Sequence, residues 1–186
     1  MNRQEAMELL TQYTKKEGLI QHALAVEAAM AAYAEHYGED REAWGIVGLI
    51  HDFDYERFPT EEDHPFRGAE ILREKGVPEE WVLAILGHAD YSGVPRDTLM
   101  SRVLYAVDEL SGFITACGLV RPGRSLDDLE PSSVKKKMKD KRFAAAVSRE
   151  GIRQGAEELG VELDEHIRFV IGALRPIQET LGLAVL

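Results

Sequence analysis

The stretch WGIVGLIHD, residues 44–52, is the most informative part of this chain. Its apolar run ends at His51 and Asp52, and the polar, proline-containing stretch 53–65 follows. An imidazole and a carboxylate at neighbouring positions of a helix end can together hold one metal ion. A single His-Asp pair usually only caps or solvates a helix end, so the prediction depends on the residues that accompany it.

Other ligand-type residues lie in segments that the sequence predicts to be buried helices. His22, His88 and Asp108 each align at helical spacing with apolar residues of their own segments. His51 likewise extends the apolar stripe that begins at Trp44. A carboxylate such as that of Asp108 is costly to bury unless a cation neutralises it. A metal ion would be such a cation.

A lone histidine on an apolar helix face is more often a hydrogen-bonded core residue than a metal ligand. That interpretation would be enough for His22 or for His88 alone. It accounts poorly for several His and Asp residues that all point inward from separate predicted helices. We therefore predict a metal centre.

The order of these residues resembles the HD superfamily of metal-dependent phosphohydrolases. The resemblance covers residues 20–117, all within helices of one predicted domain. It implies a first metal ion that is held by His22, His51, Asp52 and Asp108.

Two further histidines resemble the second metal site of binuclear family members. His64 and the stretch Pro65–Leu72 resemble the segment that follows the His-Asp pair in those members. His88, at the end of the run ILGH, resembles their fourth histidine. By this resemblance, Asp52 bridges the two ions.

The chain departs from the family pattern directly after the His-Asp pair. Many relatives continue with Ile, Gly and a lysine, whereas this chain has Phe53, Asp54 and Tyr55. The cation that helps to hold phosphate in some relatives is therefore absent from that position. The run Asp90–Pro95 is only faintly similar to the motif of cyclic-di-GMP phosphodiesterases, and we do not assign that activity.

The resemblance implies an enzyme that hydrolyses a phosphomonoester or phosphodiester of a nucleotide or small metabolite. A metal-bound hydroxide would attack phosphorus while the cations stabilise the nonbridging oxygens. Asp52 would hold the ions, and either Asp54 or Glu56 would orient the water or protonate the leaving group. Histidine and carboxylate ligands are compatible with one or two divalent ions of Fe, Mn, Zn, Co, Ni or Mg.

Two other functions stay open at this stage. A few HD-superfamily proteins use the same ligand set to bind two irons and activate dioxygen. A regulatory module that binds a nucleotide without turning it over is the other alternative, although such a module has no need of two metals. Phosphate release that depends on Mn, Mg or Co would favour hydrolysis, and a mixed-valence iron pair would favour oxygenation.

A basic run at residues 135–142 interrupts an otherwise acidic chain. This pattern is equally compatible with a solvated helix face and with contact to a substrate phosphate. If the run folds over the metal centre, Lys136 and Arg149 are the residues that we expect to bind substrate.

The formal net charge of −11 disfavours nonspecific nucleic-acid binding, because polyanions bind to basic surfaces. A small phosphorylated substrate remains compatible, since metal ions make a pocket locally positive. No apolar run approaches the roughly 20 residues of a membrane span, and the first residues lack a signal-peptide hydrophobic stretch. We therefore expect a cytoplasmic enzyme that does not interact with membranes, and the sequence does not predict its oligomeric state.

Hydrophobic periodicity predicts an all-α fold, a compact multi-helix HD-type domain with a C-terminal helical extension. Residues 1–186 are expected to form one domain, with a metal-binding core at about 19–117 and a helical cap at about 131–186. The expected helices lie near residues 3–16, 20–37, 41–51, 65–75, 78–89, 97–117, 132–138, 147–159 and 164–181. His36 and His166 are expected to be structural or exposed, and Cys117 to be a packed thiol.

Overall fold

The structure is a computed structural model that describes residues 1–185. The predicted all-α class is confirmed: the described residues form nine α-helices and two short 3₁₀ helices, with no strand among them. The elements are α1 (Arg3–Tyr13), α2 (Glu17–Tyr37), α3 (Arg41–Ile50), α4 (Phe66–Glu74), α5 (Glu79–Gly87), η1 (Asp90–Ser92), α6 (Leu99–Leu119), α7 (Pro131–Met138), α8 (Arg149–Leu159), α9 (Leu163–Leu174) and η2 (Arg175–Ile177).

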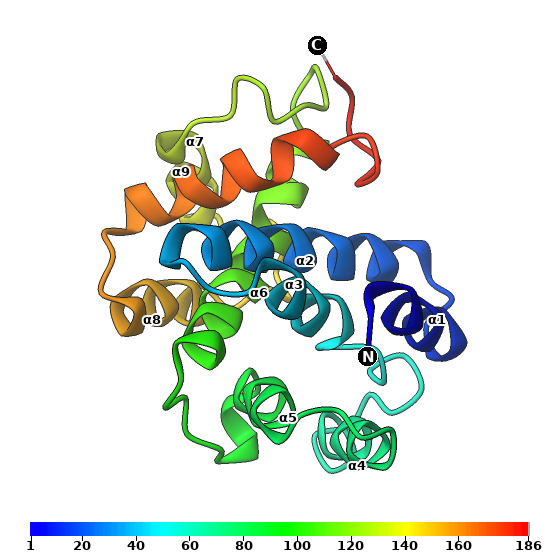
Figure 1. Ribbon diagram of the computed structural model, residues 1–186. Helices are drawn as coiled ribbons and strands as arrows, with labels where there is room; N and C mark the ends of the chain where they lie inside the picture. Colours follow the sequence, from blue (N-terminus) through cyan, green and yellow to red (C-terminus); the bar gives the residue numbers. More distant parts are fainter. Residues whose placement is uncertain (186) are drawn as a thin grey trace.

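The two longest helices, α2 and α6, cross in the interior, and the other elements pack around them. In Figure 1, α2 runs across the middle, α9 lies above it, and α4 and α5 lie below. α3 packs along α2, α8 packs along α6, and α9 contacts both central helices. His22 and Asp108 therefore come from the two central helices, and His51 and His88 from the ends of α3 and α5, whereas Asp52 and His64 lie in the segment between α3 and α4.

Local sequence explains where several helices begin and end. The side chain of Asn2 accepts a hydrogen bond from the backbone N–H of Glu5, and the Glu5 carboxylate accepts one from the Asn2 N–H, a reciprocal cap that starts α1. Asp40 caps α3 in a similar way. α2 ends at Gly38, whose φ of 74° is the left-handed conformation that glycine adopts most readily.

The last helix is shorter than its sequence pattern predicts. The pattern extends to residue 181, but α9 ends at Leu174 and a 3₁₀ turn follows. Pro176 lies in this turn, and proline has no N–H to continue a helical hydrogen-bond ladder. The apolar residues beyond it, such as Leu181 and Leu183, are buried without being helical.

Near its C-terminal end, α3 approaches the backbone of α2 closely at Gly48. A Cβ added at Gly48 would lie 2.8 Å from the carbonyl oxygen of Val26, so only glycine fits there. The rings of His22 and His51 lie 5.3 Å apart between their centroids, next to this contact. The small residue in the apolar run therefore determines how close the two histidines come.

His166 joins α9 to both central helices. It is 1% exposed, its Nε2 donates to the carbonyl of Ala106 on α6, and its Nδ1 accepts from the hydroxyl of Tyr33 on α2. Burial lowers the pKa of His166, so the neutral imidazole that makes both bonds is favoured. The residue is structural, as expected, and lies apart from the metal-ligand candidates.

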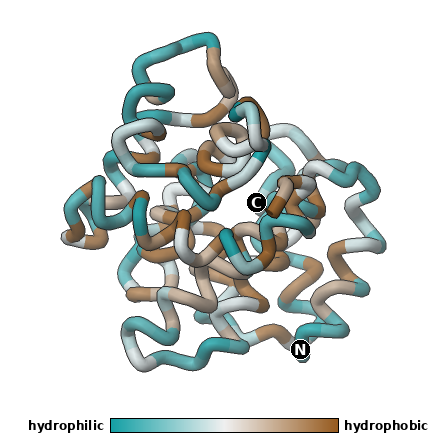
Figure 2. Tube along the Cα trace, turned by 90° about the horizontal axis from the view of Figure 1, so that it is seen from above, coloured by the Kyte–Doolittle hydropathy of each residue, from teal (hydrophilic) through white to brown (hydrophobic). Residues whose placement is uncertain are grey.

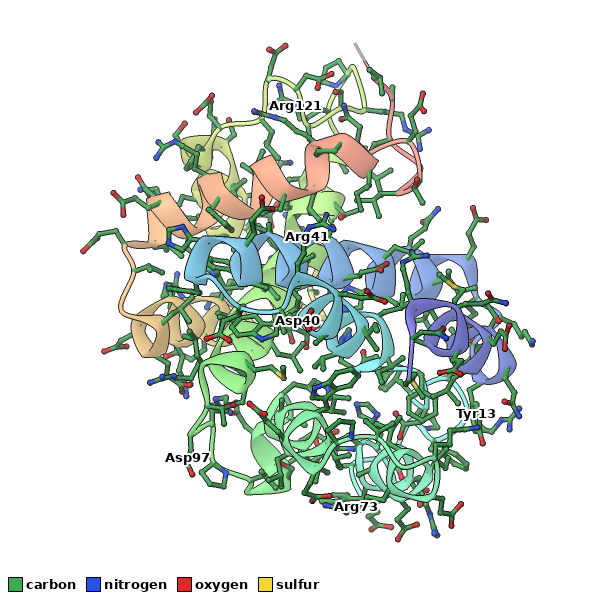
Figure 3. All side chains as sticks on the ribbon, viewed as in Figure 1. Tyr13, Asp40, Arg41, Arg73, Asp97 and Arg121 are labelled. Atoms are coloured by element: carbon green, nitrogen blue, oxygen red, sulfur yellow. The ribbon has the colours of Figure 1, made fainter. Side chains whose placement is uncertain are left out.

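Charged side chains cover the outside of the helical assembly. Seen from above in Figure 2, hydrophilic residues follow much of the outer path of the chain, and hydrophobic residues recur on its inner side. Arg73 and Asp97, for example, lie at the periphery in Figure 3 and are exposed. None of the helices described is both long enough and apolar enough to cross a membrane.

The contact between α8 and α6 gives a test of this packing. A Cβ added at Gly155 would lie 2.6 Å from the Cα of Ala106, so Gly155→Ala must push the two helices apart. We expect this variant to lower the free energy of unfolding by about 1–3 kcal/mol, as overpacking does. Urea denaturation followed by circular dichroism measures the effect.

Gly172→Ala is the matched control. Gly172 is exposed on α9 with no atom within 4 Å of an added Cβ. The same substitution there should stabilise the protein by up to about 1 kcal/mol, because alanine favours helix over glycine. An unfolding midpoint for Gly155→Ala equal to or above that of the wild type would contradict the packing described here.

Candidate metal centre

Six His and Asp side chains from separate elements come together as two triads. The first triad is His22 from α2, His51 directly after α3, and Asp108 from α6. The second triad is Asp52, His64 and His88. Within each triad, one ligand-type atom per residue lies within 4.8 Å of the others.

Distances within the triads show that the imidazole nitrogens gather around two carboxylate oxygens. In the first triad, Nε2 of His22 lies 2.9 Å and Nε2 of His51 lies 3.3 Å from Oδ1 of Asp108. In the second triad, Nε2 of His64 and of His88 lie 3.2 and 3.1 Å from Oδ1 of Asp52. This clustering of nitrogen and oxygen donors is the arrangement that a divalent metal ion requires.

Asp52 lies between the two triads. Its Oδ2 is 3.6 Å from Nε2 of His51, and its Oδ1 faces the histidines of its own triad. The ring centroids of His51 and His88 are 5.3 Å apart, so the triads are neighbours. The position of Asp52 fits the bridging role that the family resemblance implies.

Three of the four histidines form a hydrogen bond through Nδ1, the ring nitrogen that faces away from the carboxylate of the triad. Nδ1 of His51 donates to the carbonyl of Gly48 at 2.7 Å, and Nδ1 of His88 donates to the carbonyl of Ile85. Nδ1 of His64 donates to the carboxylate of Asp54 at 2.8 Å. Acceptors of this kind fix the tautomer and leave Nε2 with its lone pair toward the centre, as in known metal-binding histidines.

The buried polar atoms of the centre support its fit to metal ions. Nε2 of His51 and Oδ1 of Asp52 are buried without a hydrogen-bond partner in the described chain. Buried polar atoms are seldom unpaired in folded proteins, and each exception calls for an explanation. A cation between the triads would satisfy both atoms, and imidazole and carboxylate are donors that Fe, Mn, Zn, Co and Ni accept.

The two carboxylates remain ionised although they are partly buried, with the side chains of Asp52 and Asp108 23% and 16% exposed. Burial favours the neutral acid of Asp52, but the charge of His51 and the two histidines of its own triad outweigh it and hold the pKa well below its usual range. Burial likewise opposes ionisation of Asp108, and His51 and His22 outweigh it and lower its pKa. The centre is therefore a cluster of negative charge that needs cationic partners.

In the absence of a metal, the imidazoles are these partners. Burial acts against protonation, but Asp52 and Asp108 raise the pKa of His51, and Asp52 raises that of His88. Contacts with Asp52 and Asp54 raise the pKa of His64 to about 9. Since a metal ligand must be an unprotonated imidazole, protons and metal ions compete for the same atoms.

Asp54 is buried beside the second triad, where its carboxylate contacts His64 and the backbone of Gly68. It is 1% exposed, and besides His64 it accepts a hydrogen bond from the backbone N–H of Gly68 at 2.9 Å. A Cβ at Gly68 would lie 2.7 Å from Cγ of Asp54, so the glycine makes room for the carboxylate. These contacts favour a role in orienting His64. The predicted catalytic role of Asp54 stays a prediction.

An open pocket of about 540 Å³ lies over both triads. Five of the six triad residues line it, whereas His51 lies beneath them with no exposed surface. The start of α8 closes one side through Ser148 and Gly151. The C-terminal helices thus contribute to the wall of the pocket.

The basic residues that sequence reasoning favoured lie outside this pocket wall. Lys136 is exposed on α7 and is absent from the lining. The guanidinium of Arg149 donates to four carbonyl oxygens of the turn before α8, those of Asp140, Phe143, Ala144 and Val147. Arg149 therefore holds the turn that carries Ser148, and direct substrate contact by either residue stays a prediction.

Three pocket residues were given no role by the sequence analysis. Tyr55 and Tyr91 line the pocket and are 41% and 45% exposed. Glu109 lines it beside Asp108; burial, reinforced by the charge of Asp108, raises the pKa of Glu109 to about 7. Helical periodicity alone does not reveal that a residue next to a buried ligand also faces the cavity. The proximity of the tyrosines to His64 and His88 in sequence was the available signal.

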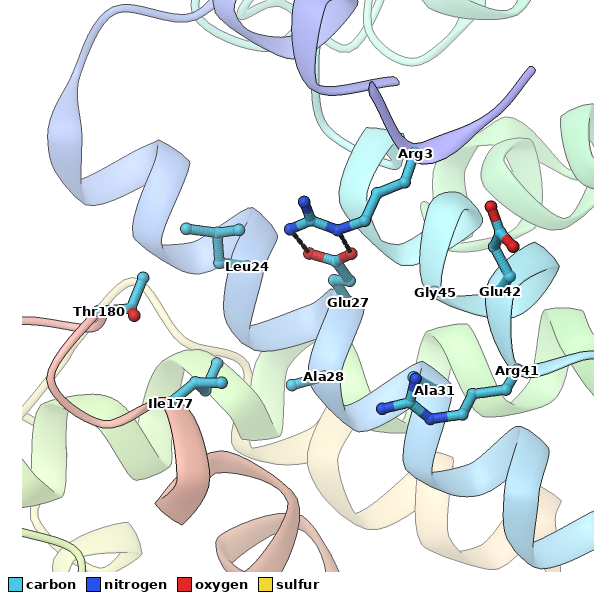
Figure 4. A pocket seen from close by; sticks show the side chains of 10 residues that line it. All are labelled: Arg3, Leu24, Glu27, Ala28, Ala31, Arg41, Glu42, Gly45, Ile177 and Thr180. Carbon is cyan, nitrogen blue, oxygen red and sulfur yellow. Dashed lines mark hydrogen bonds and ion pairs between the residues drawn. The ribbon is translucent and has the colours of Figure 1, made fainter. Parts of the chain in front are cut away.

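A separate cavity of about 480 Å³ lies between α1, α2, α3 and the segment after α9 (Figure 4). Arg3 forms a two-pronged ion pair with Glu27 at its edge, and Arg41 points into it. Its described lining includes neither histidine nor cysteine. This cavity therefore adds nothing to the metal centre.

Comparisons with known proteins agree with the geometry. The chain is 32% identical over 124 residues to ribonuclease Y of Lawsonia intracellularis (strain PHE/MN1-00), an alignment that covers 64% of this chain and 21% of the ribonuclease. The chain thus spans about a fifth of the length of this curated relative. No solved structure matches the chain.

A family model provides the decisive match. The model of the HD domain matches residues 19–112, which is half of the chain and contains every residue of both triads. The fold, the two triads and this match together show that the chain belongs to the HD domain family, within the superfamily of metal-dependent phosphohydrolases.

Proposed function

We propose that this protein hydrolyses a phosphate ester of a small molecule with two divalent metal ions that His22, His51, Asp52, His64, His88 and Asp108 hold. The observation that carries the proposal is the tethering of three histidines through Nδ1, which directs their Nε2 atoms toward the carboxylates of Asp52 and Asp108. When bound, the ions would lower the pKa of a water molecule and neutralise phosphate oxygens.

Asp52, Asp54 and the start of α8 would each have a further role at the site. Asp52, which contacts both triads, would keep the ions at a fixed separation. Asp54 would keep His64 in the ring orientation that its ligand role needs. The start of α8 would limit the access of water to the pocket through Ser148 and Gly151. Because α8 forms part of the wall, we also propose that the cap at about 131–186 forms one domain with the HD core.

The name of the ribonuclease relative makes an RNA phosphodiester a second substrate class to test. The net charge of −11 argues for a small substrate, since a polyanion would be repelled by the surface at large. The di-iron oxygenase alternative uses the same ligands, and only the identity of the bound metal and its chemistry separate it from hydrolysis.

The two triads predict the metal content of the protein. Purified protein that is reconstituted with Mn²⁺ should contain two ions, one for each triad. Asp108→Asn should remove the ion of the first triad, and His88→Gln that of the second. Elemental analysis of the dialysed proteins, with circular dichroism to check folding, measures this.

His36→Gln is the matched control for metal content, because His36 is an exposed histidine of α2 that belongs to neither triad. It should retain both ions. No bound metal in the wild type after reconstitution with Mn²⁺, Fe²⁺ and Zn²⁺ in turn would refute the metal centre.

Asp54→Asn separates an orienting role from a catalytic one. If Asp54 orients His64, the variant should bind the second ion about 10- to 100-fold more weakly, as losses of such partners do. Its kcat at saturating metal should then stay near the wild-type value. A kcat that falls by the same factor with unchanged metal affinity would instead assign Asp54 to proton transfer, as the sequence analysis predicted.

Activity is tested by phosphate release from the Mn²⁺-loaded protein. We expect release from p-nitrophenyl phosphate or a nucleotide that falls at least about 100-fold in Asp52→Asn, because one substitution disturbs both ions. A single-stranded RNA is assayed in parallel. RNA cleavage without phosphate release would favour the nuclease class, and dioxygen consumption by iron-loaded protein would favour oxygenation.

A further inference from the structure

The wall of the pocket over the triads contains no lysine or arginine among the residues described. Beyond the triads, its polar members include two carboxyl groups, Asp90 and Glu109, and its rim carries the exposed Tyr55 and Tyr91. A phosphate within reach of the two metal ions would be neutralised by them. Any second anionic group further along the substrate would find no cation on this wall.

The two carboxyl groups differ in the number of hydrogen bonds that they accept from the protein. Asp90 accepts hydrogen bonds from Arg96 and from the hydroxyl of Tyr105, each at 3.0 Å. Glu109 accepts one hydrogen bond, from the backbone N–H of Ser148 to its Oε2 at 3.1 Å. Within the described chain, Oε1 of Glu109 is left without a hydrogen-bond partner. Of these two carboxyl groups, Glu109 is thus the one that keeps an oxygen available to a ligand.

Two arginines close to the pocket, Arg96 and Arg149, already form ion pairs or hydrogen bonds with other groups of the protein. Arg96 forms a two-pronged ion pair with Glu158, at 2.7 Å for both bonds, in addition to its bond with Asp90. Arg149 is occupied by the carbonyls of the turn before α8. Moving either guanidinium into the pocket would break these bonds, leaving the part-buried Glu158 carboxylate or the carbonyls of the turn without their partner.

From these contacts we propose a substrate class for the site: a phosphate monoester of an uncharged alcohol that carries at least one further hydroxyl group. Glu109 accepts a hydrogen bond from that hydroxyl, and the tyrosine rim contacts the body of the alcohol. A second phosphate is disfavoured, because a desolvated anion without a counter-charge is costly. This inference rests on the proposed hydrolytic function and adds to it a residue that determines specificity.

The rim tyrosines fit this class of alcohol. Tyr55 lies edge-on to the ring of His64, with 5.2 Å between centroids, so its ring stands beside the second triad. Tyr91 lies in η1, which directly follows the segment of His88 and is tied to α6 and α8 through the bonds of Asp90 and Arg96. Aromatic rings at the pocket mouth offer apolar contact area without charge, which suits a sugar or a base.

The test uses the Mn²⁺-loaded full chain and three related adenine nucleotides that differ in the second phosphate or in the sugar hydroxyls. These are adenosine 5′-monophosphate, adenosine 5′-diphosphate and 2′,3′-dideoxyadenosine 5′-monophosphate, with p-nitrophenyl phosphate as a general phosphate ester. We expect kcat/KM for the monophosphate to exceed that for the dideoxy compound by at least about 10-fold, the loss expected for one hydrogen bond to a charged group. It should also exceed that for the diphosphate by at least about 10-fold, because the second phosphate meets no cation on the wall.

Glu109→Gln tests the residue itself. The amide oxygen of glutamine can still accept from the Ser148 N–H, so folding should be preserved and is checked by the melting temperature. The amide nitrogen then replaces a charged acceptor with a neutral donor, whose hydrogen bond to a hydroxyl is weaker. The preference for the hydroxyl-bearing monophosphate over its dideoxy analogue should fall about 10-fold, and the relative rate with the diphosphate should rise.

Glu150→Gln is the control, since it removes the same charge from an exposed position of α8 that does not line the pocket. Both preference ratios should stay at their wild-type values in this variant. A diphosphate used as well as the monophosphate, or ratios that Glu109→Gln leaves unchanged, would overturn the inference while hydrolysis itself stands. No phosphate from any of these esters would instead refute the proposed function.

Discussion

The partial burial of Asp52 and Asp108, side by side at the floor of one pocket, is the constraint on which the rest of the structure depends. Two carboxylates in the interior of a protein are unstable unless positive charge compensates them. Four imidazoles lie about 3 Å from them, and the two carboxylates raise the pKa values of His51 and His88, while Asp52 and Asp54 raise that of His64. The helices α2, α3, α5 and α6 have to converge at one place to bring these groups together.

Close backbone contacts make this convergence possible. Gly48 lets α3 approach α2 and places His51 beside His22, and its own carbonyl then accepts from Nδ1 of His51. Gly68 makes room for Asp54, which in turn orients His64. Gly48 and Gly68 therefore permit tight packing and also help to determine the direction of the ligand nitrogens. The geometry of the site depends directly on the packing of the helices.

Charge is distributed unevenly between the pocket and the surface. The basic run around Lys136 lies on α7, outside the pocket wall, and Arg149 is used to hold a turn together. The wall itself presents carboxyl groups and tyrosines. Since the described lining holds no lysine or arginine, metal ions held by the two triads would be the positive charge available to a substrate phosphate.

The sequence by itself predicted the helical class, because its apolar residues recur with helical periodicity. The same periodicity singled out His22, His51, His88 and Asp108, and the resemblance to the HD family added Asp52 and His64 to the candidate ligands. The sequence also located most helix ends, where Asp40, Gly38 and similar residues act through local contacts. Only the tertiary structure decided that Asp54 bonds to His64 and Gly68, that Arg149 holds a turn, and that Glu109 faces the pocket. Those outcomes depend on which helices meet, and contacts between distant segments leave no periodic trace in the sequence.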